Sequence, residues 1–252
     1  MYLITFGDDW TLGTGSWYKP GMPKIVYDNT DVNYDSSWRI MLRDYYGCQD
    51  RHRNFASYKS SNQKQFALAK KYFSSKSYWG NTYKEPDKVV LWGLTTTHRD
   101  YKWCSDTYQY EDILFKDTYD ETSNKDRIGY GLNKWCYSDK IAIEELQTEI
   151  LHWNQYFKSL GIKNFWFDTF SSKPYSIKPN NFLDINSTHR DLLSLLCIDH
   201  AVGNRDSSGG WIEDKFEYGL NNKILNPHDL LPKPEGHRKI VEYFAKNLPF
   251  RT

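Results

Sequence analysis

The sequence lacks a long apolar run, a strong net charge and any basic leader. No stretch approaches the roughly 20 apolar residues of a membrane-spanning helix. The formal net charge is +1 over 252 residues, which gives no electrostatic reason to expect binding to nucleic acid or to a membrane surface. The chain opens directly on an apolar segment at 2–7, so we expect no secretion signal and synthesis in the cytoplasm of a host cell.

Closely spaced cysteines are also missing, because the four at Cys48, Cys104, Cys136 and Cys197 form no C-x-x-C pair. That spacing favours reduced, buried thiols over a disulfide framework or a zinc site. The acidic residues between 112 and 126 do not match a calcium-binding loop. We therefore predict no bound metal and no cofactor.

Alanine is scarce, and asparagine, lysine and tyrosine replace it. This bias is typical of AT-rich genomes and favours a viral or marine-microbial source. Aromatic residues make up 17% of the chain, which would suit a sugar-binding surface, a large protein interface or an aromatic core.

Short apolar runs alternate with longer amphipathic segments along the chain. Strands are predicted at 2–7, 53–57, 88–93 and 162–168, and helices at 36–46, 62–74, 139–160, 188–198 and 234–248. Residues 100–138 are aromatic, charged and nearly aperiodic, which predicts a long loop-rich insertion. The alternation indicates one α/β domain over 1–252, with a mostly parallel sheet between helices.

The loops that follow these strands carry polar motifs in a set order. Gly7-Asp8-Asp9-Trp10, residues 54–62, residues 92–99 and residues 229–237 resemble, in turn, four sequence blocks of the SGNH (GDSL-type) hydrolases. The first and third blocks are most similar to the versions carried by marine bacteriophages. The resemblance implies a three-layer α/β/α sandwich with a flavodoxin-like, five-stranded sheet.

The chemistry of that family needs a serine after the first strand and a histidine base oriented by an aspartate. Here Asp9 replaces the serine, and Leu231 or Pro232 replaces the histidine. The asparagine of the third block is replaced by Thr95 or Thr96, whose hydroxyl would still donate to an oxyanion. The loss of nucleophile and base together predicts that ordinary esterase activity is gone.

Several side chains on these loops are candidate site residues, each with a plainer alternative. The catalytic candidates are Asp9, Asp229 and His228; the oxyanion or ligand-binding candidates are Asn62, Thr95, Arg99 and Trp10. Asp8, Asp9 and Asp229 would also make an oxygen-rich metal site, although capping roles for the first two are favoured. The arginine fork suits carboxylates or sulfates, or else a salt bridge. Trp10 would stack on a sugar, seal an interface or anchor a loop.

Two hypotheses follow for the function. The first is a non-hydrolytic phage protein, a virion or tail component whose partners are other phage structural proteins or a surface glycan. The second is an active carbohydrate esterase with a rearranged site. That site would use Ser60 or Ser61 as nucleophile and His228 or His237 as base.

Overall fold

The computed structural model describes residues 1–29, 34–74, 87–104, 109–114, 124–169, 173–183, 191–197, 220–221, 224–228 and 230–249. Four parallel strands form its central sheet: β1 (Tyr2–Phe6), β2 (His52–Asn54), β3 (Lys88–Leu94) and β6 (Lys163–Asp168). Their order across the sheet is β2-β1-β3-β6. Within these described ranges no helix is both long and apolar enough to cross a membrane.

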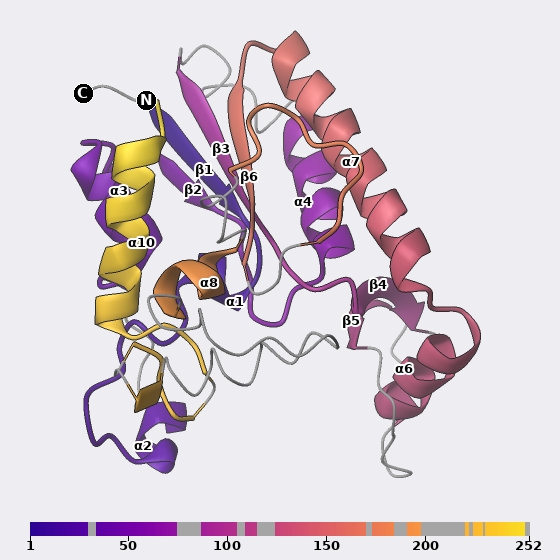
Figure 1. Cartoon of the computed structure of the whole chain (residues 1–252), viewed down its shortest axis with the longest axis horizontal. Coiled ribbons are helices and arrows are strands. Elements are labelled where there is room, and N and C mark those ends of the chain that lie inside the picture. The colour runs from indigo at the N-terminus through magenta and orange to yellow at the C-terminus, as the bar shows by residue number, and fades with distance from the viewer. Residues whose placement is uncertain are drawn as a thin grey trace, which may run out of the picture.

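Helices cover both faces of this sheet (Figure 1). On one side lie α3 (Trp38–Tyr45), α8 (Leu192–Cys197) and α10 (Pro234–Asn247); on the other lie α4 (Asn62–Ser74) and α7 (Asp139–Ser159). The fold is therefore an α/β/α sandwich, as predicted. In the described residues the predicted fifth strand appears as two isolated parallel bridges beside β6, Trp166 with Phe182 and Asp168 with Asp191.

Side chains alternate along each strand, so the sheet separates two cores. Leu3, Val89, Leu91, Phe165 and Phe167 point toward α3 and α10. The residues between them point toward α4 and α7; they are Tyr2, Ile4, Phe6, Val90, Trp92, Leu94 and Trp166. Because both faces are buried, the strands read as continuous apolar runs, which is why they were predictable.

The segment 100–138 is where the fold prediction was wrong. It contains an antiparallel hairpin, β4 (Arg99–Cys104) with β5 (Gln109–Leu114), followed by α6 (Asn124–Trp135). The hairpin extends away from the central sheet (Figure 1), and although Ile113 of β5 is buried, the segment carries no regular apolar alternation in its sequence. Across the hairpin, the rings of Tyr101 and Tyr110 contact each other, with centroids 5.2 Å apart.

Most other boundaries differ by a few residues. The strand predicted at 53–57 is β2, and helix α3 begins after Ser37 rather than after Asp35. The helix predicted at 188–198 is the shorter α8. Two short helices were not predicted: α1 (Asp9–Leu12) and α2 (Lys24–Asn29).

Candidate functional site

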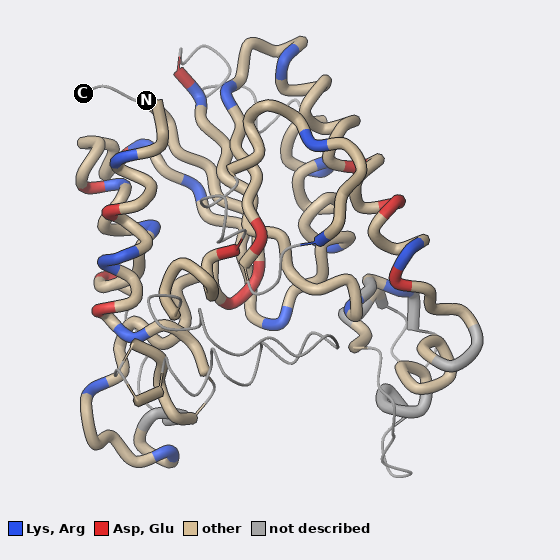
Figure 2. Tube along the Cα trace, in the orientation of Figure 1, with Lys and Arg blue, Asp and Glu red and all other residues tan. Residues whose placement is uncertain are grey.

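A polar, mostly buried cluster lies where β1, β3 and β6 end. It contains Asp8 and Asp9 after β1, Thr95 after β3, Arg99 at the start of β4 and Thr169 after β6. Figure 2 shows acidic positions gathered at this end of the sheet, in the middle of the molecule. In parallel sheets the carboxyl ends of neighbouring strands form the usual ligand site, so this cluster is the candidate functional site.

Asp8 caps helix α1 and is fully buried. Its carboxylate accepts a hydrogen bond from the Trp10 amide (3.1 Å) and one from the Thr169 hydroxyl (3.5 Å). Burial raises the pKa of Asp8, against the opposing effects of the Thr95 hydroxyl and of Arg99. The predicted role of this carboxylate, bonding the amides of the turn, is confirmed.

Asp9 is the first residue of α1 and is only 5% exposed. One carboxylate oxygen accepts from the Lys59 amide at 2.9 Å, and the other lies 3.9 Å from Arg99 Nη1. Burial, and then the neighbouring Asp8, raise the pKa of Asp9 to about 7, while the Lys59 amide and Arg99 oppose the shift. The side chain therefore has both an amide donor and a cation facing it.

The Lys59 amide is a site group that the sequence analysis missed. Lys59 has a left-handed backbone (φ 52°) in the loop between β2 and α4. Gln65 holds that loop over the end of β1, because its side chain accepts from the Gly7 amide (3.1 Å) and donates to Ser60 Oγ (2.6 Å). The only sequence signal is position, since Lys59 lies inside the second block of motif residues.

Asn62 and Thr95, both predicted to bind a ligand, bind each other. The Asn62 side chain accepts from the Thr95 amide and donates to the Thr95 carbonyl, both at 3.0 Å. Asn62 thus fixes the loop after β3 rather than offering a free amide group, which corrects its predicted role. The Thr95 hydroxyl faces Asp8, but it is buried without a hydrogen bond of good geometry among the described residues.

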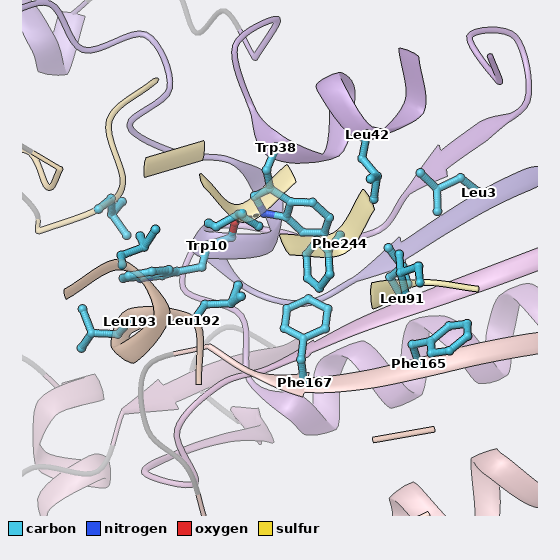
Figure 3. Packing of buried hydrophobic residues seen from close by; sticks show 14 of the residues in the cluster. Leu3, Trp10, Trp38, Leu42, Leu91, Phe165, Phe167, Leu192, Leu193 and Phe244 are labelled. Atoms are coloured by element: carbon cyan, nitrogen blue, oxygen red, sulfur yellow. Dashed lines mark hydrogen bonds between the residues drawn. The ribbon is translucent and has the colours of Figure 1, made fainter. Parts of the chain in front are cut away.

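Trp10 is not a ligand-stacking residue, contrary to the prediction. Helix α1 turns its side chain inward, where it is 1% exposed and packs in the same core as Trp38 and Leu193 (Figure 3). The Trp10 carbonyl accepts from Trp38 Nε1 at 2.7 Å. The loop-anchor alternative therefore holds for Trp10, and Tyr18 further along the same loop is buried in the same way.

The predicted base positions do not supply a base near Asp9. The His228 ring pairs through Nε2 with the Met22 carbonyl (2.8 Å) and packs edge-on against Tyr18. Leu231 is buried in the core with α3 and α10. Asp229 lies outside the described residues.

The residues named for a rearranged site have other partners in the structure. Ser60 Oγ is occupied by Gln65, and Ser61 Oγ accepts from the Lys64 amide at 3.2 Å as a helix cap. His237 is fully buried, and that burial lowers its pKa to about 3, so its ring stays neutral. No described histidine is hydrogen-bonded to either serine.

A second buried ionic cluster lies at the end of β6 and was missed. Lys173 Nζ lies 2.7 Å from an oxygen of Asp168, and the Tyr175 hydroxyl donates to the same oxygen at 3.0 Å. All three side chains are largely buried; burial raises the pKa of Asp168 and that of Tyr175. The sequence separation of five and seven residues gave no motif to detect.

Residues of the metal-binding types do not gather in the part of the chain that the structure describes. There, no group of three or more His, Cys, Asp or Glu side chains is placed to hold an ion. The two carboxylates of the candidate site, Asp8 and Asp9, are instead bound by amides, a hydroxyl and Arg99.

Comparison with known proteins finds similarity in structure but not in sequence. No family model matches, and no curated protein matches. One similar solved structure is a putative lipolytic protein of the G-D-S-L family from Desulfitobacterium hafniense, with 13% identity and a TM-score of 0.44. The match covers 97% of this chain and 98% of that one.

Two further solved structures are esterases. A psychrotrophic esterase from Pseudoalteromonas has 8% identity and a TM-score of 0.40, over 98% of this chain and 96% of that one. An acetyl xylan esterase has 10% identity and a TM-score of 0.42, over 98% and 100%. Similarity at this level carries no argument about activity. The parallel sheet, its two helical layers and the motif residues on the loops after the strands agree with the fold that the resemblance to SGNH hydrolases implies.

Proposed function

We propose that this chain has kept an SGNH hydrolase-like fold but lost serine-esterase activity, and that it acts as a binding or structural component. The observation that carries the proposal is the hydrogen bond from the Lys59 amide to the Asp9 carboxylate. A backbone amide of this loop would, by the family resemblance, help bind the oxyanion of an ester intermediate. Here a side chain of the protein itself occupies that donor.

Electrostatics support the same conclusion. Acyl transfer builds negative charge on a carbonyl oxygen, which an esterase stabilises with unoccupied donors. The Asp9 carboxylate would repel that charge, and it offers no hydroxyl for attack on an ester. The Arg99 guanidinium, which could stabilise such a charge, already faces Asp9 at 3.9 Å.

The finer role is a virion or tail component of a phage that contacts other phage proteins or a surface glycan. The supporting features are the amino-acid bias typical of AT-rich genomes, the phage-like motif blocks and the high aromatic content. Detection of the chain by mass spectrometry in purified particles tests this role. Its absence from particles, when it is abundant in infected cells, would remove the virion assignment and leave the loss of esterase activity standing.

The catalytic part is tested on the purified full chain with aryl acetates, acetylated sugars and a fluorophosphonate probe. We expect no turnover above the uncatalysed rate and no labelling. Asp9→Ser alone should stay inactive because, among the described residues, no histidine is hydrogen-bonded at this position to act as its base. Esterase turnover in the wild type that Asp9→Asn abolishes, while the surface change Asp44→Asn does not, would contradict the proposal.

The double variant Asp9→Ser with Leu231→His tests whether the surrounding scaffold survives. Leu231 lies in the core, so the added imidazole is expected to lower stability before it supplies a base. Fluorophosphonate labelling at position 9 in a folded double variant would show that only the two substituted side chains separate this chain from an active site.

A further inference from the structure

A small cavity lies beside the candidate site, between the start of α4, the loop after β3 and the start of α7. Its volume is about 190 Å³, roughly that of six water molecules in the liquid. Gln63, Thr97, Ser138 and Glu145 contribute to its walls, with Lys102 from the hairpin. Gln63 and Thr97 adjoin the Asn62–Thr95 pair, so the cavity is built on the same two loops as the site.

One wall of the cavity is a preformed hydrogen-bond network. The Thr97 hydroxyl lies 2.9 Å from the Tyr137 hydroxyl, which in turn bonds to the Asp139 carboxylate. Thr97 is 8% exposed, and the Tyr137 ring packs on His98 with centroids 4.9 Å apart. These contacts hold the tyrosine in place before any ligand arrives, so a ligand would meet a fixed polar wall.

Two further groups at this cavity have unmet hydrogen-bonding capacity. Gln63 Oε1 is buried and has no hydrogen-bond partner within the described ranges. Helix α7 begins at Asp139, and its N-cap residue, Ser138, makes no side-chain cap bond to the amides of the first turn. The cavity therefore has an acceptor that lacks a donor, and Ser138 in its wall leaves the first amides of α7 without a side-chain cap.

We propose that this cavity binds one uncharged sugar ring, as the glycan contact of the binding role proposed above, on which this inference rests. A sugar hydroxyl both donates and accepts, so one ligand class can satisfy Gln63 Oε1 and the α7 amides together. The lining residues Lys102 and Glu145 carry opposite charges, and the Asp139 carboxylate behind Tyr137 already accepts from the tyrosine hydroxyl. Leu132, Ile141 and Ala142 form an apolar side for the C–H face of the ring.

Charged ligands fit the same walls less well. An anion would suit the α7 amides and Lys102 but would face Glu145 and leave Gln63 Oε1 without a donor. A cation would suit Gln63, Glu145 and the nearby Asp139, but a group that only donates would leave the α7 amides without an acceptor. Only a ligand with both kinds of group, and without net charge, matches every wall.

The test is an NMR titration of the isotope-labelled full chain. The neutral probes are glucose, galactose and N-acetylglucosamine, and the charged probes are glucuronic acid and glucosamine. At least one neutral sugar should bind with a Kd of about 1 mM, as expected for a ligand of this size, and should shift the signals of Leu132 and Ala142. Gln63→Ala and Glu145→Ala should each weaken binding about tenfold.

Glu149→Ala is the matched control, because Glu149 lies about one helical turn further along α7 and lines a different groove, between α4 and α7. It should leave the Kd unchanged. The inference is overturned if no neutral sugar binds, if only a charged probe binds, or if binding survives both pocket variants. Esterase turnover would refute the proposed loss of activity without touching this cavity, so the two failures are distinguishable.

Discussion

Lys173 is a single residue whose ion pair, at the end of β6, should contribute strongly to the stability of the fold. Its ammonium is the only cation within the described residues to form an ion pair with the buried Asp168 carboxylate. Removing a single partner leaves a buried charge uncompensated, so Lys173→Met should cost about 3–5 kcal/mol in the free energy of unfolding. Urea denaturation measures the loss.

The reference variants separate lost charge from lost packing. Lys71→Met, on the exposed side of α4, should change stability by less than about 0.5 kcal/mol. Asp168→Asn combined with Lys173→Met should be more stable than Lys173→Met alone, because no buried charge remains. A single Lys173→Met variant as stable as the wild type would show that the ion pair contributes nothing.

At the same scale, the sequence shows which groups are missing from the site but not which groups are present. Asp9 and Leu231 stand out because a motif fixes their positions. Lys59 acts through its amide, and Lys173 through a contact five residues away, so neither follows from residue type. Trp10 was misassigned because the sequence around a loop tryptophan does not indicate whether its side chain faces solvent or the core.

Among the elements, helix α1 packs unusually close to the sheet, and two glycines permit it. A Cβ on Gly93, in β3, would lie 1.9 Å from the Thr11 hydroxyl, and one on Gly7 would lie 2.2 Å from it. Gly93→Ala should therefore destabilise the chain by roughly 1–3 kcal/mol through overcrowding. Adding Thr11→Ala should recover part of this loss.

Gly131→Ala in α6 is the opposite case, with no atom within 4 Å of the added methyl group. It should stabilise by about 0.5–1 kcal/mol, because alanine favours a helix interior. Thermal unfolding of the Gly93→Ala, Gly93→Ala/Thr11→Ala and Gly131→Ala variants measures these changes in stability. If Gly93→Ala and Gly131→Ala behave alike, α1 does not lie against β3 as described.

The elements differ in how well their sequences predicted them, for a physical reason. Strands β1, β3 and β6 are buried on both faces, and α4 and α7 carry an apolar stripe, so their patterns are strong. The β4–β5 hairpin lacks a sheet against it and so shows no such pattern. Helix α1 is four residues long, too short for periodicity to appear.

For the whole molecule, two buried groups give opposite pH dependences of stability. Asp9 has a pKa raised to about 7, so between about pH 4 and 7 it is protonated when folded and ionised when unfolded. Its contribution to stability falls by about 1.4 kcal/mol per pH unit as the pH rises. The pKa of His237 is lowered to about 3, so between about pH 3 and 6.5 the unfolded chain binds the extra proton, and its contribution rises with pH.

The two slopes oppose each other where these windows overlap, between about pH 4 and 6.5. Asp9→Asn should therefore be more stable than the wild type at pH 8, and the difference should shrink as the pH falls through 7 toward 4. His237→Asn should lose stability at pH 8 because its site was built for a buried ring, yet its deficit should diminish toward pH 4. Denaturant unfolding at closely spaced pH values measures both differences.

Asp168 remains in every variant, so its titration cancels when each variant is compared with the wild type. The shape of each difference curve therefore reports the substituted group and its immediate neighbours. Parallel pH profiles for the wild type and Asp9→Asn would mean that Asp9 is ionised in the folded chain throughout. The electrostatic case against ester hydrolysis would then rest on a fully charged carboxylate facing Arg99.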